Sequence, residues 1–260
     1  MFDGKQVFAR LSSEGVCTVT LNNPDQLNAL NTTMADECAE LARMIASSSA
    51  RVIVFTGAGR AFSAGGDLNY LIELTRLSAA ESQASMLRFY QSYLSLFRLP
   101  LPTIAHINGA CVGAGFCLAL ACDMRFVVSG AKIGMNFVRI GLNPGMAAEF
   151  WAQEFASPIL KEMLYTGKIF NASESRFASL FNLVASAEEI DFAVKETAAS
   201  IAANSPQSIR ISAEIMRAAN QSAENIMLAE ARGQGICMSS GEIAAAVEAQ
   251  RANRPFRFKI

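Results

Sequence analysis

Residues 102–126 read PTIAHINGACVGAGFCLALACDMRF, and this stretch decides the fold. The run Thr103 to Ile107 predicts a strand, the segment from Ala114 to Ala121 predicts a helix, and Met124 to Val128 predicts a second strand. A strand, a helix and a further strand in this order place the chain in the α/β class, with mainly parallel pairing.

The amino-terminal side of this stretch follows the same alternation. Val7 to Leu11 and Val16 to Leu21 are rich in β-branched residues and are separated by Ser-Ser-Glu-Gly, which predicts a hairpin. Asn31 to Ala46 has the spacing of an amphipathic helix, and Arg51 to Thr56 is typical of a strand buried on both faces. Glu81 to Phe97 predicts another helix.

From Pro158 onward the sequence becomes mostly helical, and no second independent core is implied. We expect a helical tail of this length to pack on its own domain or on a neighbouring subunit. The predicted helices are Ile159 to Thr166, Ser173 to Leu180, Glu188 to Ala203, Pro206 to Ala219 and Ala223 to Ser239.

The composition favours one large globular domain that assembles with other subunits. The chain has 260 residues and a formal net charge of -1, and charged residues are 17% of it, whereas an average soluble chain has about 25%. Subunit interfaces are the expected reason for this shortage. Near-neutral charge excludes nucleic acid or an anionic membrane surface as the main partner, and the apolar content of 52% excludes disorder.

No segment predicts a membrane span or a secretory signal. The longest apolar stretch, Ala110 to Cys122, is well short of the ~18 residues of a span and predicts a buried helix. The expected location is cytoplasmic. Six cysteines without CxxC spacing are expected to be reduced thiols. The single histidine, His106, allows no histidine-based metal cluster, has no apparent partner and is expected to be structural.

Two glycine-rich segments, each directly after a predicted strand, form the candidate catalytic site, and we call them the strand exits. The first reads AFSAGGDL at residues 61–68, and the second follows Ile107 with Gly109, Gly113 and Gly115. Small residues between a strand and a helix leave backbone N–H groups that a ligand oxygen can approach, so two such sites could share one oxyanion. Neither fits a P-loop or GxGxxG, which excludes nucleotide phosphate cradling by these motifs.

Taken together and in this order, these motifs resemble the crotonase superfamily, also called the enoyl-CoA hydratase/isomerase family. The resemblance includes LNNPDQLNAL at 21–30, AFSAGGDL at 61–68 and the stretch at 102–126. It continues through IGLNPG at 140–145 and EMLYTGK at 162–168.

The resemblance implies a spiral of ββα turns with a helical carboxyl-terminal region, assembled as a homotrimer or a dimer of trimers. Residues 1–200 would form the spiral core that binds acyl-CoA, and residues 201–260 would form the region for trimerisation and pocket closure. The thioester oxygen would lie between the N–H groups of Ala64 and Ala114. The ligand is the CoA thioester substrate itself, with no further cofactor and no metal.

The resemblance also implies where the CoA arm binds. Asn69 stands where relatives often have a lysine near the CoA phosphates, so Arg251 or Arg254 would have to supply that charge. Asp67 is expected to cap the helix that follows it. The residues expected along the substrate are Gln26, Ala29, Gly66, Asp67, Leu68, Cys117 and Phe137.

The pattern breaks at the two glutamates that family hydratases use for proton transfer. Cys117 stands at the first of these positions and Phe137 at the second. The flanking residues predict an inert, desolvated thiol at Cys117 rather than a nucleophile. A phenylalanine cannot transfer a proton, so the usual syn hydration is not supported.

Some isomerases of the family use instead a glutamate directly after the proline of a later loop, but here Gly145 follows Pro144. Glu149 lies one helical turn further on and could reach the same space. The alternative is that Glu149 is an ordinary first-turn carboxylate.

The leading hypothesis is therefore an acyl-CoA enzyme that stabilises a thioester enolate and moves an enoyl-CoA double bond, with Glu149 as the proton shuttle. The alternatives are a catalytically silent acyl-CoA-binding paralogue and an acyl-CoA decarboxylase or thioesterase. An ordinary enoyl-CoA hydratase is disfavoured.

Overall fold

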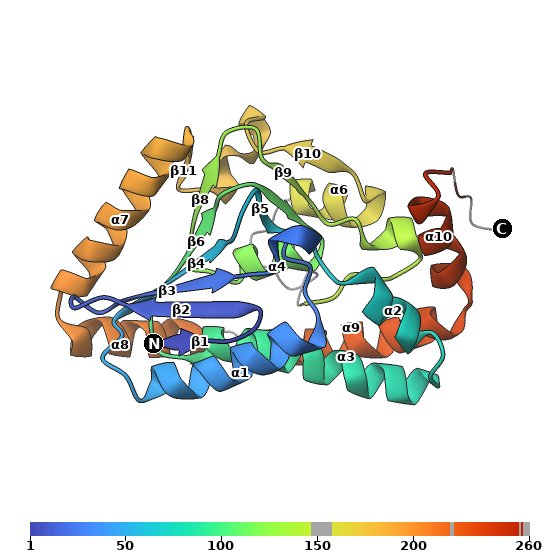
Figure 1. Ribbon diagram of the computed structural model, residues 1–260, viewed down its shortest axis with the longest axis horizontal. Coiled ribbons are helices and arrows are strands. Elements are labelled where there is room, and N and C mark those ends of the chain that lie inside the picture. The colour runs from blue at the N-terminus through green and yellow to red at the C-terminus, as the bar shows by residue number, and fades with distance from the viewer. Residues whose placement is uncertain (147–157, 219–220, 255, 257–260) are drawn as a thin grey trace.

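Two β-sheets form the centre of the molecule, and helices lie along both sides of them (Figure 1). The computed structural model describes residues 1–146, 158–218, 221–254 and 256. In neighbour order, the larger sheet contains β1 (Phe2–Asp3), β2 (Val7–Leu11), β3 (Val16–Leu21), β4 (Val52–Gly57), β6 (Thr103–Ile107), β8 (Met124–Val128) and β11 (Leu183–Ala185), and the smaller contains β10 (Ile169–Asn171), β9 (Lys132–Gly134), β7 (Ala110–Val112) and β5 (Ala61–Ser63).

The larger sheet confirms both the hairpin and the parallel pairing that the sequence predicts. β2 and β3 are antiparallel, with Val7 opposite Leu21 and Leu11 opposite Cys17. From β3 onward every neighbour pair, through β4, β6 and β8 to β11, is parallel. The chain therefore has a mixed α/β fold with a mainly parallel sheet, as expected.

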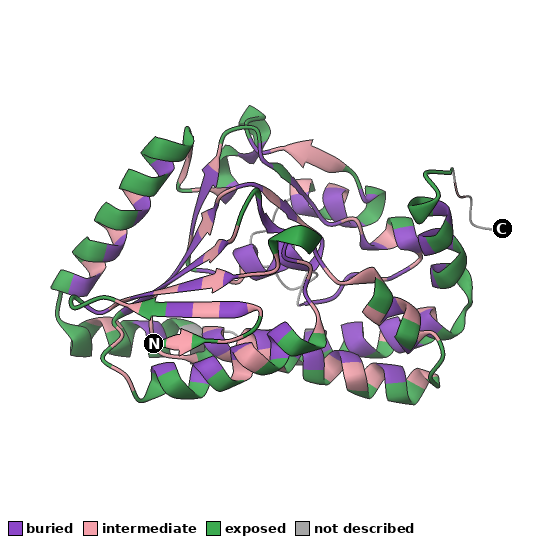
Figure 2. Cartoon of the chain, viewed as in Figure 1, coloured by how far each residue is buried: buried purple, intermediate pink, exposed green. Residues whose placement is uncertain are grey.

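The central strand β4 is buried on both faces. Because successive side chains of a strand point to opposite faces, Ile53 and Phe55 enter the main core while Val52 and Val54 enter a second cluster. Helix α7 (Ala187–Ala203) covers that second face with its buried residues (Figures 1 and 2). This explains the uninterrupted apolar run at 52–55, since neither face meets water.

His106 has a partner that the sequence did not reveal. It lies in β6, and its Nε2 is 3.0 Å from Oδ1 of Asp191 in α7. The expectation of a histidine without a partner was wrong because the two residues meet only when α7 packs across the sheet. The contact between His106 and Asp191 nevertheless joins a strand to the helix that covers it, which is a structural role.

On the other face of the large sheet, α1 (Thr32–Ala46) packs against β2, and α3 (Ala79–Leu94) and α9 (Gln221–Ser239) extend the same core. The last two pack against each other along the lower edge in Figure 1. None of the described helices is long and apolar enough to cross a membrane. The remaining helices are η1 (Pro24–Gln26), α2 (Leu68–Leu74), η2 (Ser95–Arg98), α4 (Ala114–Leu120), η3 (Phe137–Ile140), α6 (Pro158–Thr166), η4 (Ser175–Leu180), α8 (Pro206–Ala218) and α10 (Glu242–Arg251).

Two expectations about these elements were wrong, and one helix was not predicted. The apolar stretch Ala110 to Cys122 is not one helix, because its first three residues form β7 between β5 and β9 before α4 begins. The predicted helix Ser173 to Leu180 is only the 3-10 helix η4. Helix α10 was not predicted at all. The division of the chain at residue 200 stays a prediction.

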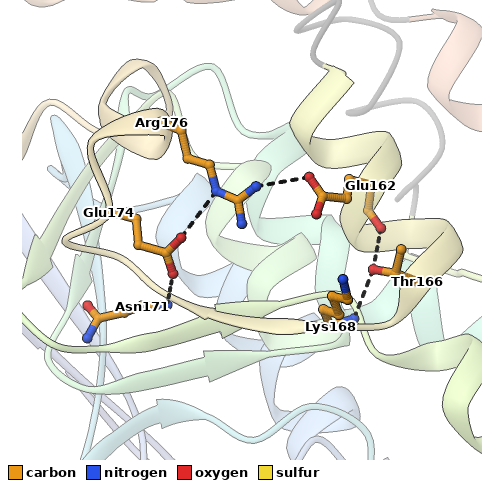
Figure 3. Close-up of polar contacts among 6 residues, drawn as sticks. All are labelled: Glu162, Thr166, Lys168, Asn171, Glu174 and Arg176. Carbon is orange, nitrogen blue, oxygen red and sulfur yellow. Dashed lines mark hydrogen bonds and ion pairs between the residues drawn. The ribbon is translucent and has the colours of Figure 1, made fainter.

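Arg176 fastens the turn after β10 to helix α6 (Figure 3). Its guanidinium is 3.0 Å from Glu162 of α6 and 3.2 Å from Glu174. It also lies over the rings of Phe170 and Phe177, at 4.4 and 4.8 Å from their centroids. Since all three ion-pairing side chains are more than one third exposed, the ring contacts are expected to contribute more than the ion pairs.

Candidate active site

The two glycine-rich strand exits meet at one edge of the smaller sheet. β5 and β7 are parallel neighbours, with Ala61 opposite Ala110, so the loops that follow them lie side by side. Gly65 has φ +97°, and a Cβ added there would be 2.9 Å from the carbonyl oxygen of Val112 and 3.5 Å from the nitrogen of Ala114. A glycine is required here because the two backbones touch and because φ is positive.

The free backbone N–H of the first strand exit belongs to Gly66 rather than to Ala64. The N–H of Ala64 donates to the carbonyl of Leu27 at 2.9 Å, so it is not left for a ligand. Gly66 forms a parallel bridge with Leu30, and the hydrogen bonds of that bridge use the residues on either side of Gly66. The assignment of Ala64 was wrong because the sequence does not show that the loop at 27–30 occupies its amide.

The free N–H of the second strand exit belongs to Ala114, the residue that the sequence predicts as the second donor. It is the first residue of α4, where an N–H has no partner inside the helix. The N–H of the preceding Gly113 donates to the carbonyl of Gly134 at 2.8 Å. Among the described residues no hydrogen bond uses the N–H of Gly66 or of Ala114, so both can be directed at one ligand oxygen.

Asn28 holds the loop at 27–30 against the first strand exit. Its side chain is fully buried and its Nδ2 donates to the carbonyls of Ala58 at 2.9 Å and Ala61 at 2.8 Å. The hydroxyl of Ser63 donates to the carbonyl of Asn28 at 2.8 Å. Asn28 has φ +54°, a conformation that asparagine tolerates better than most residues. The sequence alone does not reveal this role, because the two carbonyls that Asn28 binds belong to a segment at least 30 residues away.

A cavity of about 390 Å³ opens beside the two donors. Most of the residues that the sequence assigned to substrate line it, so the structure brings together segments from four parts of the chain. These lining residues are Gln26, Ala29, Ala64, Gly66, Asp67, Leu68, Ala114 and Phe137.

One of the described site residues predicted from the sequence, Cys117, is not in this wall. Cys117 lies inside α4 with no exposed surface, and its side chain belongs to the main core rather than to the cavity. Glu149 lies outside the described residues. Phe137 lines the cavity and is 7% exposed, so an apolar ring occupies the second hydratase position.

Several lining residues were missed, because they come from helices whose packing partners are remote in sequence. Helix α3 supplies Met86, Phe89 and Tyr90, and α9 supplies Gln234. Asn136, beside Phe137, also lines the cavity. The helical spacing of the α3 residues was visible in the sequence, but it indicated only a core face.

Charge in the described wall of the cavity is limited to one carboxylate and one cation. Asp67 accepts hydrogen bonds from the N–H groups of Asn69 at 2.6 Å and Tyr70 at 3.3 Å, which confirms that it caps α2. Arg251 of α10 donates to the side chain of Asn69. Burial raises the pKa of the Tyr70 hydroxyl, which therefore stays protonated and can donate. Apart from Asp67, whose carboxylate caps α2, the described wall of the cavity contains no carboxylate that could act as a base.

Comparisons with a family model, with known relatives and with a solved structure all point to the same family. The model of the family described as enoyl-CoA hydratase/isomerase matches residues 12–258. A Thermus thermophilus relative, named after enoyl-CoA hydratase, is 30% identical over 245 residues, covering 94% of this chain and 97% of that protein. The crotonyl-CoA hydratase of Syntrophomonas wolfei is 28% identical over 248 residues, covering 92% and 94%. The crystal structure of an enoyl-CoA hydratase from Mycobacterium avium subsp. paratuberculosis has the same fold, with a TM-score of 0.84, 24% identity and coverage of 99% of this chain and 100% of that one.

Proposed function

The chain belongs to the enoyl-CoA hydratase/isomerase family, and on that premise we propose that it binds an acyl-CoA thioester and stabilises the enolate of that thioester between the N–H groups of Gly66 and Ala114. The observation that carries this proposal is that both N–H groups border one cavity and neither is used by a hydrogen bond among the described residues. Two such donors stabilise negative charge as it develops on the thioester oxygen, and each typically contributes about 3 kcal/mol to the transition state.

The proposed reaction is the movement of an enoyl-CoA double bond from C3 to C2. A base removes a proton from C2, the enolate is held by the two donors, and the proton is returned to C4. This reaction needs one proton shuttle rather than the two glutamates of a hydratase. Since Cys117 is buried in the core and Phe137 has no acidic proton, Glu149 is the proposed shuttle.

The CoA arm is proposed to lie along Gln26, Ala29 and Leu68, with its phosphates near Arg251. This arginine is exposed, lines the cavity and is held in place by Asn69, the residue that replaces the lysine of many relatives. A guanidinium binds phosphate oxygens well because it presents several donors in one plane.

The proposed assembly is a homotrimer or a dimer of trimers. Large apolar side chains of α8, namely Ile211, Ile215 and Met216, are 47 to 67% exposed in the single chain. Covering them in an assembly would account for the low content of charged residues.

Incubation of the protein with 3-enoyl-CoA in deuterated water tests the proposal. The expected result is a conjugated 2-enoyl-CoA with deuterium incorporated, and loss of the reaction in Glu149→Gln. If the wild type isomerises and Glu149→Gln does so equally well, the shuttle has been assigned to the wrong residue. Binding of several acyl-CoA esters with no reaction of any of them would favour the silent paralogue.

A further inference from the structure

Among the described residues, the fully buried polar side chains that line the cavity are those of Tyr90 and Gln234. Tyr90 of α3 is 1% exposed and Gln234 of α9 has no exposed surface, yet both line the cavity. The Tyr90 hydroxyl donates to Oε1 of Gln234. Nε2 of Gln234 in turn donates to the carbonyl of Asn143 at 3.0 Å. The pair thus joins two helices to the loop at 142–146.

This pair occupies the space next to Gly145. A Cβ added to Gly145 would collide with the Tyr90 hydroxyl and with Nε2 of Gln234. The position directly after Pro144 therefore admits only glycine while the pair is in place. The glutamate that some isomerases have at this position is absent here, and a phenol and a carboxamide fill the space instead.

An apolar acyl chain would not need these two groups. Their surroundings at this end include Met86, Phe89 and Leu142, and a buried hydroxyl or amide is costly there unless it is hydrogen-bonded. Phenylalanine and methionine could fill the same volume without that cost. Gln234 Nε2 carries two N–H groups, and Asn143 accepts one of them, so the other can donate to an oxygen on a ligand.

We propose that Tyr90 and Gln234 make the cavity selective for acyl-CoA thioesters whose acyl chain carries a neutral oxygen function, a hydroxyl or a keto group, beyond C3. The proposal rests on the proposed function, which places the thioester oxygen at Gly66 and Ala114. An oxygen on C3 would face the positions of the two missing glutamates, where Cys117 lies in the core and Phe137 is apolar.

A carboxylate at the same place is disfavoured by charge. The cation in the described wall of the cavity is Arg251, which is exposed at the rim and bonded to Asn69. At the buried end a carboxylate would have no described cation beside it, and an unpaired buried charge is more costly than a hydrogen-bonded neutral oxygen.

Calorimetric titration of the wild-type protein with two matched ligands tests this selectivity without requiring turnover. 4-Hydroxybutyryl-CoA and pentanoyl-CoA have acyl groups with the same number of heavy atoms. We expect the hydroxy ester to bind about tenfold more tightly, the discrimination typical of one well-placed hydrogen bond. Equal or tighter binding of pentanoyl-CoA would overturn the proposal. Tighter binding of succinyl-CoA than of 4-hydroxybutyryl-CoA would overturn the choice of a neutral oxygen.

The variants Tyr90→Phe and Gln234→Met separate selectivity from a structural role. Each should bring the ratio of the two dissociation constants close to one. Tyr93→Phe is the matched control, because Tyr93 is also a buried tyrosine of α3, its hydroxyl donates to the carbonyl of Asn31 at 2.9 Å, and it does not line the cavity. It should leave the ratio unchanged. If Gln234→Met folds and keeps the wild-type ratio, the pair only clamps the helices.

The two proposals fail in different ways. A wild-type protein that shows the binding ratio but exchanges no deuterium would refute the isomerase and leave the selectivity intact. A protein that isomerises 3-enoyl-CoA but prefers pentanoyl-CoA over 4-hydroxybutyryl-CoA would refute the selectivity and support the isomerase. Since the wild-type ratio needs no variant, a substitution that prevents folding does not affect this test.

Discussion

The backbone N–H of Ala64 donates to the carbonyl of Leu27 at 2.9 Å, whereas the N–H of Gly66, like that of Ala114, has no hydrogen bond among the described residues. A single hydrogen bond therefore decides which residue of the AFSAGGDL motif can meet a ligand. The motif lies against the loop at 27–30, which accepts the N–H groups of Ala64 and Asp67, while the N–H of Gly65 donates to the hydroxyl of Ser63.

Replacing Gly66 by proline removes this donor. We expect Gly66→Pro to slow deuterium exchange at C2 of a bound acyl-CoA about 100-fold to 1,000-fold. Gly66→Ala retains the N–H, and its Cβ would meet nothing within 4 Å, so it should stay within a few-fold of the wild type. Exchange followed by mass spectrometry distinguishes them, and an active Gly66→Pro would show that another group binds the oxygen.

Arg251 should contribute to CoA affinity through its charge. We expect Arg251→Gln to weaken the binding of CoA about threefold to tenfold, and the difference from wild type should shrink as salt is added. Arg254→Gln is the control, since Arg254 is also exposed, lies 3.8 Å from Glu248 and does not line the cavity. Titration calorimetry at low and high ionic strength measures both. A larger loss in Arg254→Gln would reverse the assignment.

Asn28 should be a stability determinant of the site. Asn28→Ala leaves the carbonyls of Ala58 and Ala61 and the N–H of Asn23 without their side-chain partner, and we expect a loss of about 2–4 kcal/mol in the free energy of unfolding. Asn22→Ala, in a half-buried neighbour, should cost less than about 0.5 kcal/mol. Denaturation with urea measures both, and equal losses would contradict the role of Asn28.

His106 should make stability depend on pH. Burial, which outweighs the attraction of Asp191, lowers the pKa of the imidazole below its ordinary 6.5, and Lys195 lowers it further. The unfolded chain therefore binds a proton more readily than the folded one, so the contribution of His106 is present above pH 6.5 and is lost as the pH falls below it.

Urea denaturation between pH 7.5 and pH 5.5, a range set by the ordinary histidine pKa, checks this. The free energy of unfolding should fall over this range in the wild type and fall less in His106→Gln. Asp191→Asn removes the group that raises the pKa of His106, so the free energy of unfolding of this variant should fall more steeply than that of the wild type. An identical slope in all three proteins would show that His106 does not titrate in this range.

The local elements were predictable where one short segment contains the whole signal. The apolar run ending at Thr56, the amphipathic spacing of α1 and the Asp67 cap each depend on neighbours in sequence, and all were confirmed. β7 was not predictable, because its three residues become a strand only between β5 and β9. The same limit applies to His106, because its partner Asp191 lies 85 residues later in the chain.

Sequence alone determined the α/β class, the family resemblance, the absence of glutamates at positions 117 and 137, and Ala114 as a candidate donor. These follow from residue identity and from spacing along one strand or helix. Only the tertiary structure decided that Gly66 rather than Ala64 has the available N–H, that Cys117 faces the core, and that Tyr90 and Gln234 meet beside Gly145. The physical reason is that each of these depends on which group a remote segment occupies, and a backbone N–H or a buried side chain has its chemistry set by that partner.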